Sequence, residues 1–297
     1  MIKLTGVRRN TTGIGIAWMV VATFLFVSLD TTAKYLTAHY PVEQVVWARF
    51  TFHFAFVFAL LAPRGKAMLL SQRPGLQLLR SCFMLTANLC FFLAIRTLAL
   101  VDASAIVFCG PLFLTALSVP MLGERVGVRR WCAVAVGFVG AMIVIRPGAQ
   151  VLQSVAALPL ISALAFAFYQ IFTRKLATVD APMTTLLYTS VVGMVTMSLL
   201  VPLVWVEPDA LGWLLMAVAG LFGAAGQLAL IKAIQLAPVS VVAPFNYLGL
   251  VWASALGFLF FGDLPDRYTL VGASIIAASG LYILHRERQL RLSEART

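Results

Sequence analysis

The feature that most constrains this chain is a series of long apolar stretches joined by short connections. A helix needs about 20 apolar residues to cross the hydrocarbon core of a bilayer. Transmembrane β-strands are shorter and alternate apolar with polar residues, which these stretches do not. The sequence therefore predicts an all-α membrane protein with ten transmembrane helices, at about residues 13–33, 42–62, 76–97, 102–122, 128–146, 156–175, 183–205, 210–232, 238–261 and 268–285.

The composition excludes a water-soluble protein. Of the 297 residues, 61% are hydrophobic and 11% are charged, whereas soluble domains carry about 25% charged residues. The net charge of +11 does not indicate nucleic-acid binding, because its distribution follows the expected spans. With a cytoplasmic N-terminus, 17 Lys and Arg residues fall on the inner side and 5 on the outer side. This bias predicts that both termini are cytoplasmic, including a basic tail at 286–297.

The second half of the chain repeats the first at an offset of about 140 residues. The run AIRTLALVDASA at 94–105 returns as AIQLAPVSVVA at 233–243, and Gly123 has its counterpart at Gly262. We place the two copies at 13–146 and 156–285. Because each copy holds five spans, an odd number, the copies must have opposite orientations in the membrane. Inverted repeats of this kind are typical of transporters, with the substrate bound near the midplane between the copies.

Several motifs resemble the EamA domain of the drug/metabolite transporter superfamily. The first copy carries PLFLTAL at 111–117 and LGER at 122–125, and the second carries APFNYLGLVW at 243–252 followed by FGDLP. The second copy departs from the pattern at Asp263, where Glu is usual. The resemblance implies a multi-pass carrier of small metabolites in a bacterial inner membrane. The family includes exporters of aromatic and other amino acids, and uptake carriers for riboflavin or S-adenosylmethionine.

Two amides occupy equivalent positions near the centres of their spans. Asn88 in the third span corresponds to Gln227 in the eighth, at an offset of 139. Uncharged amides supply both donors and acceptors, which suits a zwitterionic or amide-rich solute. The alternative is that they join neighbouring helices by hydrogen bonds.

Further candidates for substrate contact are two repeat-related pairs, Ser28 with Tyr169 and Phe108 with Asn246, together with polar or aromatic residues beside them or one helical turn from Ser28 or Asn88. Aromatic rings could form a wall that stacks on a flat substrate, although most Phe residues of a membrane protein face lipid or its core. This set comprises Ser28, Tyr169, Gln170, Asn246, Tyr247, Phe24, Phe91 and Phe108.

Three prolines in spans four and nine, Pro111, Pro238 and Pro244, are candidate hinges for gating. Proline lacks an amide hydrogen and bends a helix, so a static kink is the alternative interpretation. Glu124 and Arg125 are expected in a cytoplasmic turn, where they could latch a closed state.

Charged residues near the span ends are expected to be anchors rather than ligands. Asp30 and Lys34 stand four residues apart and can pair on one helix face. Arg49 is expected to extend to the outer surface. Because Asp30, Glu43 and Asp102 all lie toward outer ends, no carboxylate is expected at a span centre. This favours a facilitator or an exchanger over a proton-driven carrier.

The sequence predicts a transporter, with export of neutral and aromatic amino acids by alternating access as the leading function. Uptake of a flat metabolite such as riboflavin or S-adenosylmethionine is the alternative. An enzyme is not expected, because no P-loop, G-x-S-x-G or H-E-x-x-H motif is present; a structural or sensory membrane subunit is the remaining class. The expected partners are a small-molecule substrate and the lipid bilayer, without nucleic acid, cofactor or metal, and the chain could act as a monomer.

Overall fold

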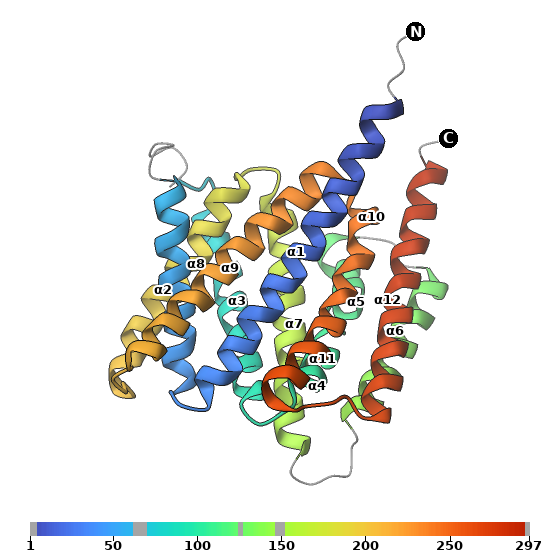
Figure 1. The fold of residues 1–297 in the computed structure, drawn as a ribbon. Helices are drawn as coiled ribbons and strands as arrows, with labels where there is room; N and C mark the ends of the chain where they lie inside the picture. The colour runs from blue at the N-terminus through green and yellow to red at the C-terminus, as the bar shows by residue number, and fades with distance from the viewer. Residues whose placement is uncertain (1–4, 62–69, 124–126, 146–151, 295–297) are drawn as a thin grey trace.

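The computed structural model describes residues 5–61, 70–123, 127–145 and 152–294, which form a bundle of helices (Figure 1). Glu124 and Arg125 lie outside these residues. The first copy contains α1 (Thr5–Thr37), α2 (Val42–Leu61), α3 (Pro74–Ile95), α4 (Leu100–Val107), α5 (Gly110–Leu122) and α6 (Val128–Ile145). The second contains α7 (Leu152–Leu176), α8 (Pro182–Leu200), α9 (Ala210–Leu236), α10 (Val239–Val242), α11 (Leu248–Phe261) and α12 (Arg267–Glu294), with 3₁₀ turns η3 (Val201–Leu203) and η4 (Ala243–Tyr247).

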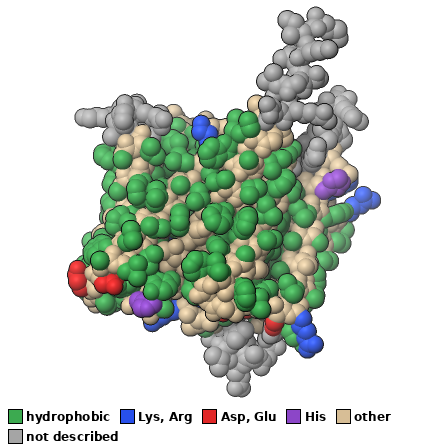
Figure 2. Space-filling view, in the orientation of Figure 1, with side chains coloured by type: hydrophobic (Ala, Val, Ile, Leu, Met, Phe, Trp, Pro, Cys, Tyr) green, Lys and Arg blue, Asp and Glu red, His purple; other side chains and the backbone are tan. Residues whose placement is uncertain are grey.

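The prediction of an all-α membrane protein is confirmed. Nine helical segments among the described residues are long and apolar enough to cross a membrane. Helix α2, which is not among these nine, corresponds to the second expected span at 42–62. Hydrophobic side chains cover the middle of the face in Figure 2, and the charged side chains lie toward its two ends. The last helix is longer than expected, since α12 continues to Glu294 through most of the basic tail.

The two copies have opposite orientations. Helix α1 begins and α12 ends at the same end of the bundle, here called the N/C face, whereas α7 begins at the opposite face (Figure 1). The backbone repeats in detail: α5 ends at Gly123 with φ 69°, and α11 ends at the equivalent Gly262 with φ 71°. Both glycines adopt the left-handed conformation that terminates helices, which side chains with a Cβ avoid.

Spans four and nine are not continuous helices. In span four, α4 ends before Phe108 and α5 begins at Gly110. In span nine, α10, the 3₁₀ turn η4 and α11 follow one another. Pro111 lies in the first turn of α5, Pro244 lies in η4, and Pro238 precedes α10. A proline fits the first turn of a helix, where no intrahelical partner for its nitrogen exists, so the breaks coincide with the prolines.

The copies do not form separate lobes. Helix α1 packs mainly against α9, α3 against α7, and α6 against α12, so each of these pairs joins one copy to the other. The α6–α12 contact depends on glycine: a Cβ on Gly272 would lie 2.6 Å from the Gly140 carbonyl oxygen. Close approach of two backbones through small residues is a common way for membrane helices to associate.

Lys34 does not pair with Asp30. Its Nζ donates to Asp263 Oδ2 at 2.7 Å and to the Leu98 carbonyl oxygen at 2.9 Å. It also lies 4.9 Å from the centre of the Phe261 ring. A pair four residues apart on one helix contributes only about 0.2–0.5 kcal/mol, and the contacts between copies replace it here. Lys34 thus joins the end of α1 to the loop between α11 and α12 at the opposite face.

Candidate functional site

The breaks in spans four and nine meet inside the bundle. Phe108, at the end of α4, stacks on Tyr247, at the end of η4, with ring centres 5.3 Å apart and an interplanar angle of 29°. Gly249 makes this approach possible, because a Cβ there would lie 3.1 Å from the Phe108 ring. Two residues expected to contact substrate are therefore in contact with each other across the two copies.

Helices α1 and α11 extend this aromatic group. Phe24 meets Trp252 edge to face, with ring centres 5.5 Å apart, and Val27 lies next to Gly249. We call Phe24, Phe108, Tyr247 and Trp252 the aromatic junction. Tyr247 Oη and Trp252 Nε1 are both buried without a hydrogen-bond partner among the described residues. Buried donors of this kind usually have a partner, so the junction has unused capacity to bind a polar group.

A second group surrounds Arg49 of α2. Its side chain is only 6% exposed, so it does not reach the surface as expected from the sequence. The guanidinium lies near the rings of Phe50 and Phe92, at 5.2 and 5.8 Å from their centres. Its Nε and Nη1 have no hydrogen-bond partner in the described part of the chain.

Asp30 and His53 complete this group. Asp30 on α1 is half-buried and interacts electrostatically with Arg49. No carboxylate of the described residues, Asp30 included, lies within 4.0 Å of the guanidinium. His53, one turn after Arg49, is buried, and its Nε2 has no hydrogen-bond partner within the described segments. Its other ring nitrogen lies against Gly223 of α9, where a Cβ would be 3.3 Å away. We call Asp30, Arg49 and His53 the Arg49 site.

Arg80 of α3, one of the 17 basic residues on the expected inner side, is buried, with its side chain only 3% exposed. Its Nε donates to Thr173 Oγ1 at 2.6 Å, and Nη2 donates to Tyr169 Oη at 2.6 Å. Its Nη1 donates to the Thr185 carbonyl and to Thr189 Oγ1. Every nitrogen of this guanidinium therefore has a partner, on α7 or α8.

The other residues predicted from the sequence are distributed around these groups. Asn88 donates to the Met84 carbonyl of its own helix and lies one turn before Phe92, which faces Arg49. Gln227 is half-buried, one turn after Gly223 on the same face of α9. The remaining positions are Ser28, buried two residues before Asp30; Phe91, buried beside Phe92; Tyr169, bound to Arg80; Gln170, half-buried on α7; and Asn246, exposed in η4.

Sequence reasoning missed Asp30, Arg49, His53 and Arg80 as interior residues. The distance of a residue from the end of a span does not tell which side of the helix faces the protein, so position along the chain could not show that these side chains are buried. One signal was available: Arg49 and His53 stand four apart in an apolar stretch and therefore share a face.

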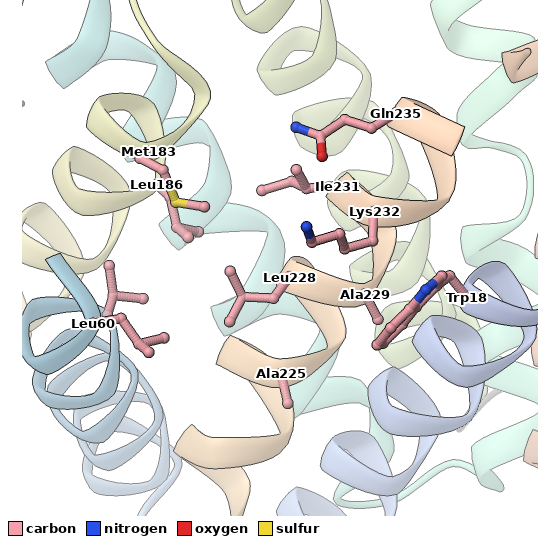
Figure 3. Close-up of a pocket in the computed structure, with 11 residues that line it drawn as sticks. Trp18, Leu60, Met183, Leu186, Ala225, Leu228, Ala229, Ile231, Lys232 and Gln235 are labelled. Carbon is pink, nitrogen blue, oxygen red and sulfur yellow. The ribbon is translucent and has the colours of Figure 1, made fainter. Parts of the chain in front are cut away.

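A pocket of about 460 Å³ lies between α1, α2, α8 and α9. Figure 3 shows Trp18, Leu60, Met183, Leu186 and Leu228 around it, with Lys232 and Gln235 on one side. None of the residues predicted to bind substrate lines this pocket. Its apolar wall suits a hydrocarbon chain better than a zwitterion.

Equivalent loop contacts occur at the two faces. Asp180, between α7 and α8, accepts hydrogen bonds from Ser71, from the Gln72 amide at 2.9 Å and from Gln77 at 2.8 Å. Burial opposes ionisation of Asp180, but these bonds outweigh it and hold the pKa below its ordinary value. At the opposite face, Asp209 accepts from the Gly212 amide and from Tyr40, which lowers the pKa of Asp209 as well. Each contact joins the loop after the first span of one copy to the beginning of the third span of the other.

Comparison with known proteins agrees with this architecture. The model of the EamA-like transporter family matches residues 13–146 and 153–284. A solved crystal structure covers 95% of this chain and 99% of its own, with a TM-score of 0.67 and 17% identity, which shows a shared fold.

Three curated relatives align over nearly their full length. An S-adenosylmethionine uptake transporter of Rickettsia bellii is 27% identical over 94% of this chain and 96% of its own. A riboflavin transporter of Rhizobium johnstonii is 30% identical over 92% of each chain. The pseudopaline exporter CntI of Pseudomonas aeruginosa is 27% identical over 89% of this chain and 94% of its own. These relatives differ in both substrate and direction.

Proposed function

The chain belongs to the EamA-like transporter family, and we propose that this transporter exports neutral and aromatic amino acids by alternating access between its two copies. The observation that carries the proposal is the aromatic junction. Its four rings come from α1, α11 and the breaks of both interrupted spans. Flat side chains stack favourably on such rings, and the unpaired Tyr247 Oη and Trp252 Nε1 can bind polar groups of a solute.

We further propose that the N/C face is cytoplasmic and that the membrane is the bacterial inner membrane. The excess of Lys and Arg on that side of the expected spans supports this orientation. Cytoplasmic tags at both ends of the chain are the expected result of a protease-protection experiment on intact cells and inverted vesicles.

The proposal is tested in proteoliposomes with labelled phenylalanine. Trp252→Ala or Phe108→Ala removes one ring contact, worth about 0.5–1.5 kcal/mol beyond burial, so we expect KM to rise about tenfold. Phe260→Ala is the matched control, because Phe260 is 64% exposed on the apolar surface, and its KM should not change. Equal effects of all three substitutions would contradict a role of the junction in binding.

Uptake of a flat metabolite is the second candidate, favoured by the two relatives named for S-adenosylmethionine and riboflavin. Both compounds carry a fused ring system that could stack at the junction. A competition panel of amino acids, S-adenosylmethionine and riboflavin against labelled phenylalanine separates the candidates. Uptake of labelled riboflavin or S-adenosylmethionine, with no uptake of labelled phenylalanine, would contradict the amino-acid proposal.

Alternating access requires contacts that close one face, and we propose Lys34 and Asp263 as such a contact. Lys34→Met should make the free energy of closing the face opposite the N/C face less favourable by about 1 kcal/mol, the upper end of the range for a partly exposed ion pair. In a cysteine-free background, Cys introduced at buried Ser104 of α4 should then react about fivefold faster with a thiol reagent. The charge-swapped double variant Lys34→Asp with Asp263→Lys should restore slow labelling. Fast labelling in the swapped variant would argue against the pair as a latch.

A further inference from the structure

Among the residues that the structure describes, the buried charge of Arg49 has no direct ion-pair partner. Burying an ionised group is costly unless it is paired and hydrogen-bonded. Arg80 shows the satisfied case in the same chain, with every guanidinium nitrogen bonded. Arg49 is almost as deeply buried, yet Nε and Nη1 have no partner among the described residues. The contrast points to a partner that is not part of the chain.

The geometry of a guanidinium indicates which ligand fits. Its planar fork matches a carboxylate, which can accept two parallel hydrogen bonds. The site also contains the Asp30 carboxylate on α1 and the unpaired Nε2 of His53, with Phe50 and Phe92 as apolar walls. The Arg49 guanidinium and the Asp30 carboxylate are not in direct contact, so the guanidinium can bind the carboxylate of a zwitterion and Asp30 can bind its ammonium group.

Helix α1 links this site to the aromatic junction. Val27 lies at the junction, next to Gly249, and Asp30 follows three residues later on the same helix face. Three residues correspond to about 4.5 Å along the helix axis, and the six residues from Phe24 to Asp30 to about 9 Å. That range is comparable to the length of an aromatic amino acid from its α-amino group to the far edge of its ring.

We propose that Arg49 binds the carboxylate of the transported substrate and Asp30 its ammonium group, while the ring lies at the aromatic junction. This inference rests on the proposed function and restricts it. Amino acids and their derivatives with a free carboxylate are substrates, whereas a flat compound without a carboxylate is not held at the Arg49 site.

The test compares ligands that differ only in their charged groups. Phenylalanine, phenylalaninamide, which lacks the carboxylate, and 3-phenylpropionate, which lacks the ammonium group, are measured as competitors in proteoliposomes and by thermal shift of the purified full chain. We expect wild type to prefer phenylalanine over the amide by roughly 100-fold, as expected when hydrogen bonds to a buried charge are lost. Arg49→Gln should reduce this preference to a few-fold. Asp30→Asn should reduce the preference for phenylalanine over 3-phenylpropionate, and it should leave the preference for phenylalanine over phenylalaninamide unchanged.

Controls separate a binding role from a structural one. Arg129→Gln removes the same charge from an exposed position at the beginning of α6, and its ligand preference should equal that of wild type. If Arg49→Gln fails to fold, Arg49→Lys keeps the charge without the fork, and its preference for the acid should fall at least tenfold. A structural arginine would change stability but leave the ratio of the two affinities unchanged.

The outcomes distinguish this inference from the proposed function. If wild type transports phenylalanine and the Arg49 variants keep the full preference over the amide, the Arg49 inference is wrong and the proposed function stands. If wild type binds S-adenosylmethionine and no amino acid, amino-acid export is wrong, and S-adenosylmethionine with its decarboxylated form supplies the same comparison at Arg49. If wild type binds riboflavin and no ligand with a carboxylate, both proposals fail.

Discussion

Replacing Arg80 by alanine is expected to lower the free energy of unfolding by roughly 2–3 kcal/mol, the range for loss of a buried hydrogen-bonding network. The guanidinium joins α3 to α7 and α8, and its Cζ lies 4.1 Å from the centre of the Tyr169 ring. Thr173 and Thr189 keep hydrogen bonds to their own helices, whereas Tyr169 Oη would lose its partner. Chemical unfolding in detergent micelles measures the change.

Two further variants make this prediction specific. Arg73→Ala removes an exposed arginine at the beginning of the same helix and should be nearly neutral. Tyr169→Phe removes one hydrogen bond to the buried guanidinium and should cost about 1.5–3 kcal/mol, the range for a hydrogen bond to a charged group. Because Arg80 and Tyr169 are in contact, the double variant should lose less than the sum of the single losses. A strictly additive result would mean that the two side chains do not stabilise each other.

Replacing Gly272 by leucine is expected to separate α6 from α12 and to cost about 1–3 kcal/mol or more, as overpacking does. The added Cβ alone would lie 2.6 Å from the Gly140 carbonyl oxygen and 3.2 Å from the Val144 amide nitrogen. Both are backbone atoms, so relief requires movement of a whole helix. The measurement is the midpoint of thermal unfolding of the purified protein, together with its yield in the membrane.

Gly75 provides the matched control for this substitution. It lies in the first turn of α3, and a Cβ at this position would meet nothing within 4 Å. Gly75→Leu should therefore change the free energy of unfolding very little, and the midpoint of thermal unfolding should stay within about one degree of the wild-type value. If Gly272→Leu were equally harmless, the close crossing of α6 and α12 would not be a determinant of stability.

The fold could be predicted largely from the sequence because its determinants are local. The length of an apolar stretch fixes whether a helix can cross a bilayer, and the repeat at about 140 residues fixes the relation between the copies. Pro111 and Pro244 also indicated where spans four and nine depart from a continuous helix, and the structure has a helix break beside each of them.

The candidate site could be predicted only in part. Phe108 aligns with Asn246, beside Tyr247, and Phe24 lies one turn before Ser28; these patterns predicted three of the residues that lie at the junction. Trp252 was not among the predicted residues, and its contact with Phe24 appears only in the tertiary structure. The amides Asn88 and Gln227 remain predictions; each lies one turn from a residue that faces Arg49.

The sequence by itself determined the number of spans, their opposite orientation in the two copies, and the family motifs, since these follow from apolar length and repetition along the chain. Only the tertiary structure decided the partners of the charged residues. Lys34 binds Asp263 across the copies, Arg80 is fully bonded between helices, and Arg49 is buried with no direct partner in the described ranges of the chain. The physical reason is that the cost of a buried charge depends on groups brought close by packing between copies, which spacing along one helix does not specify.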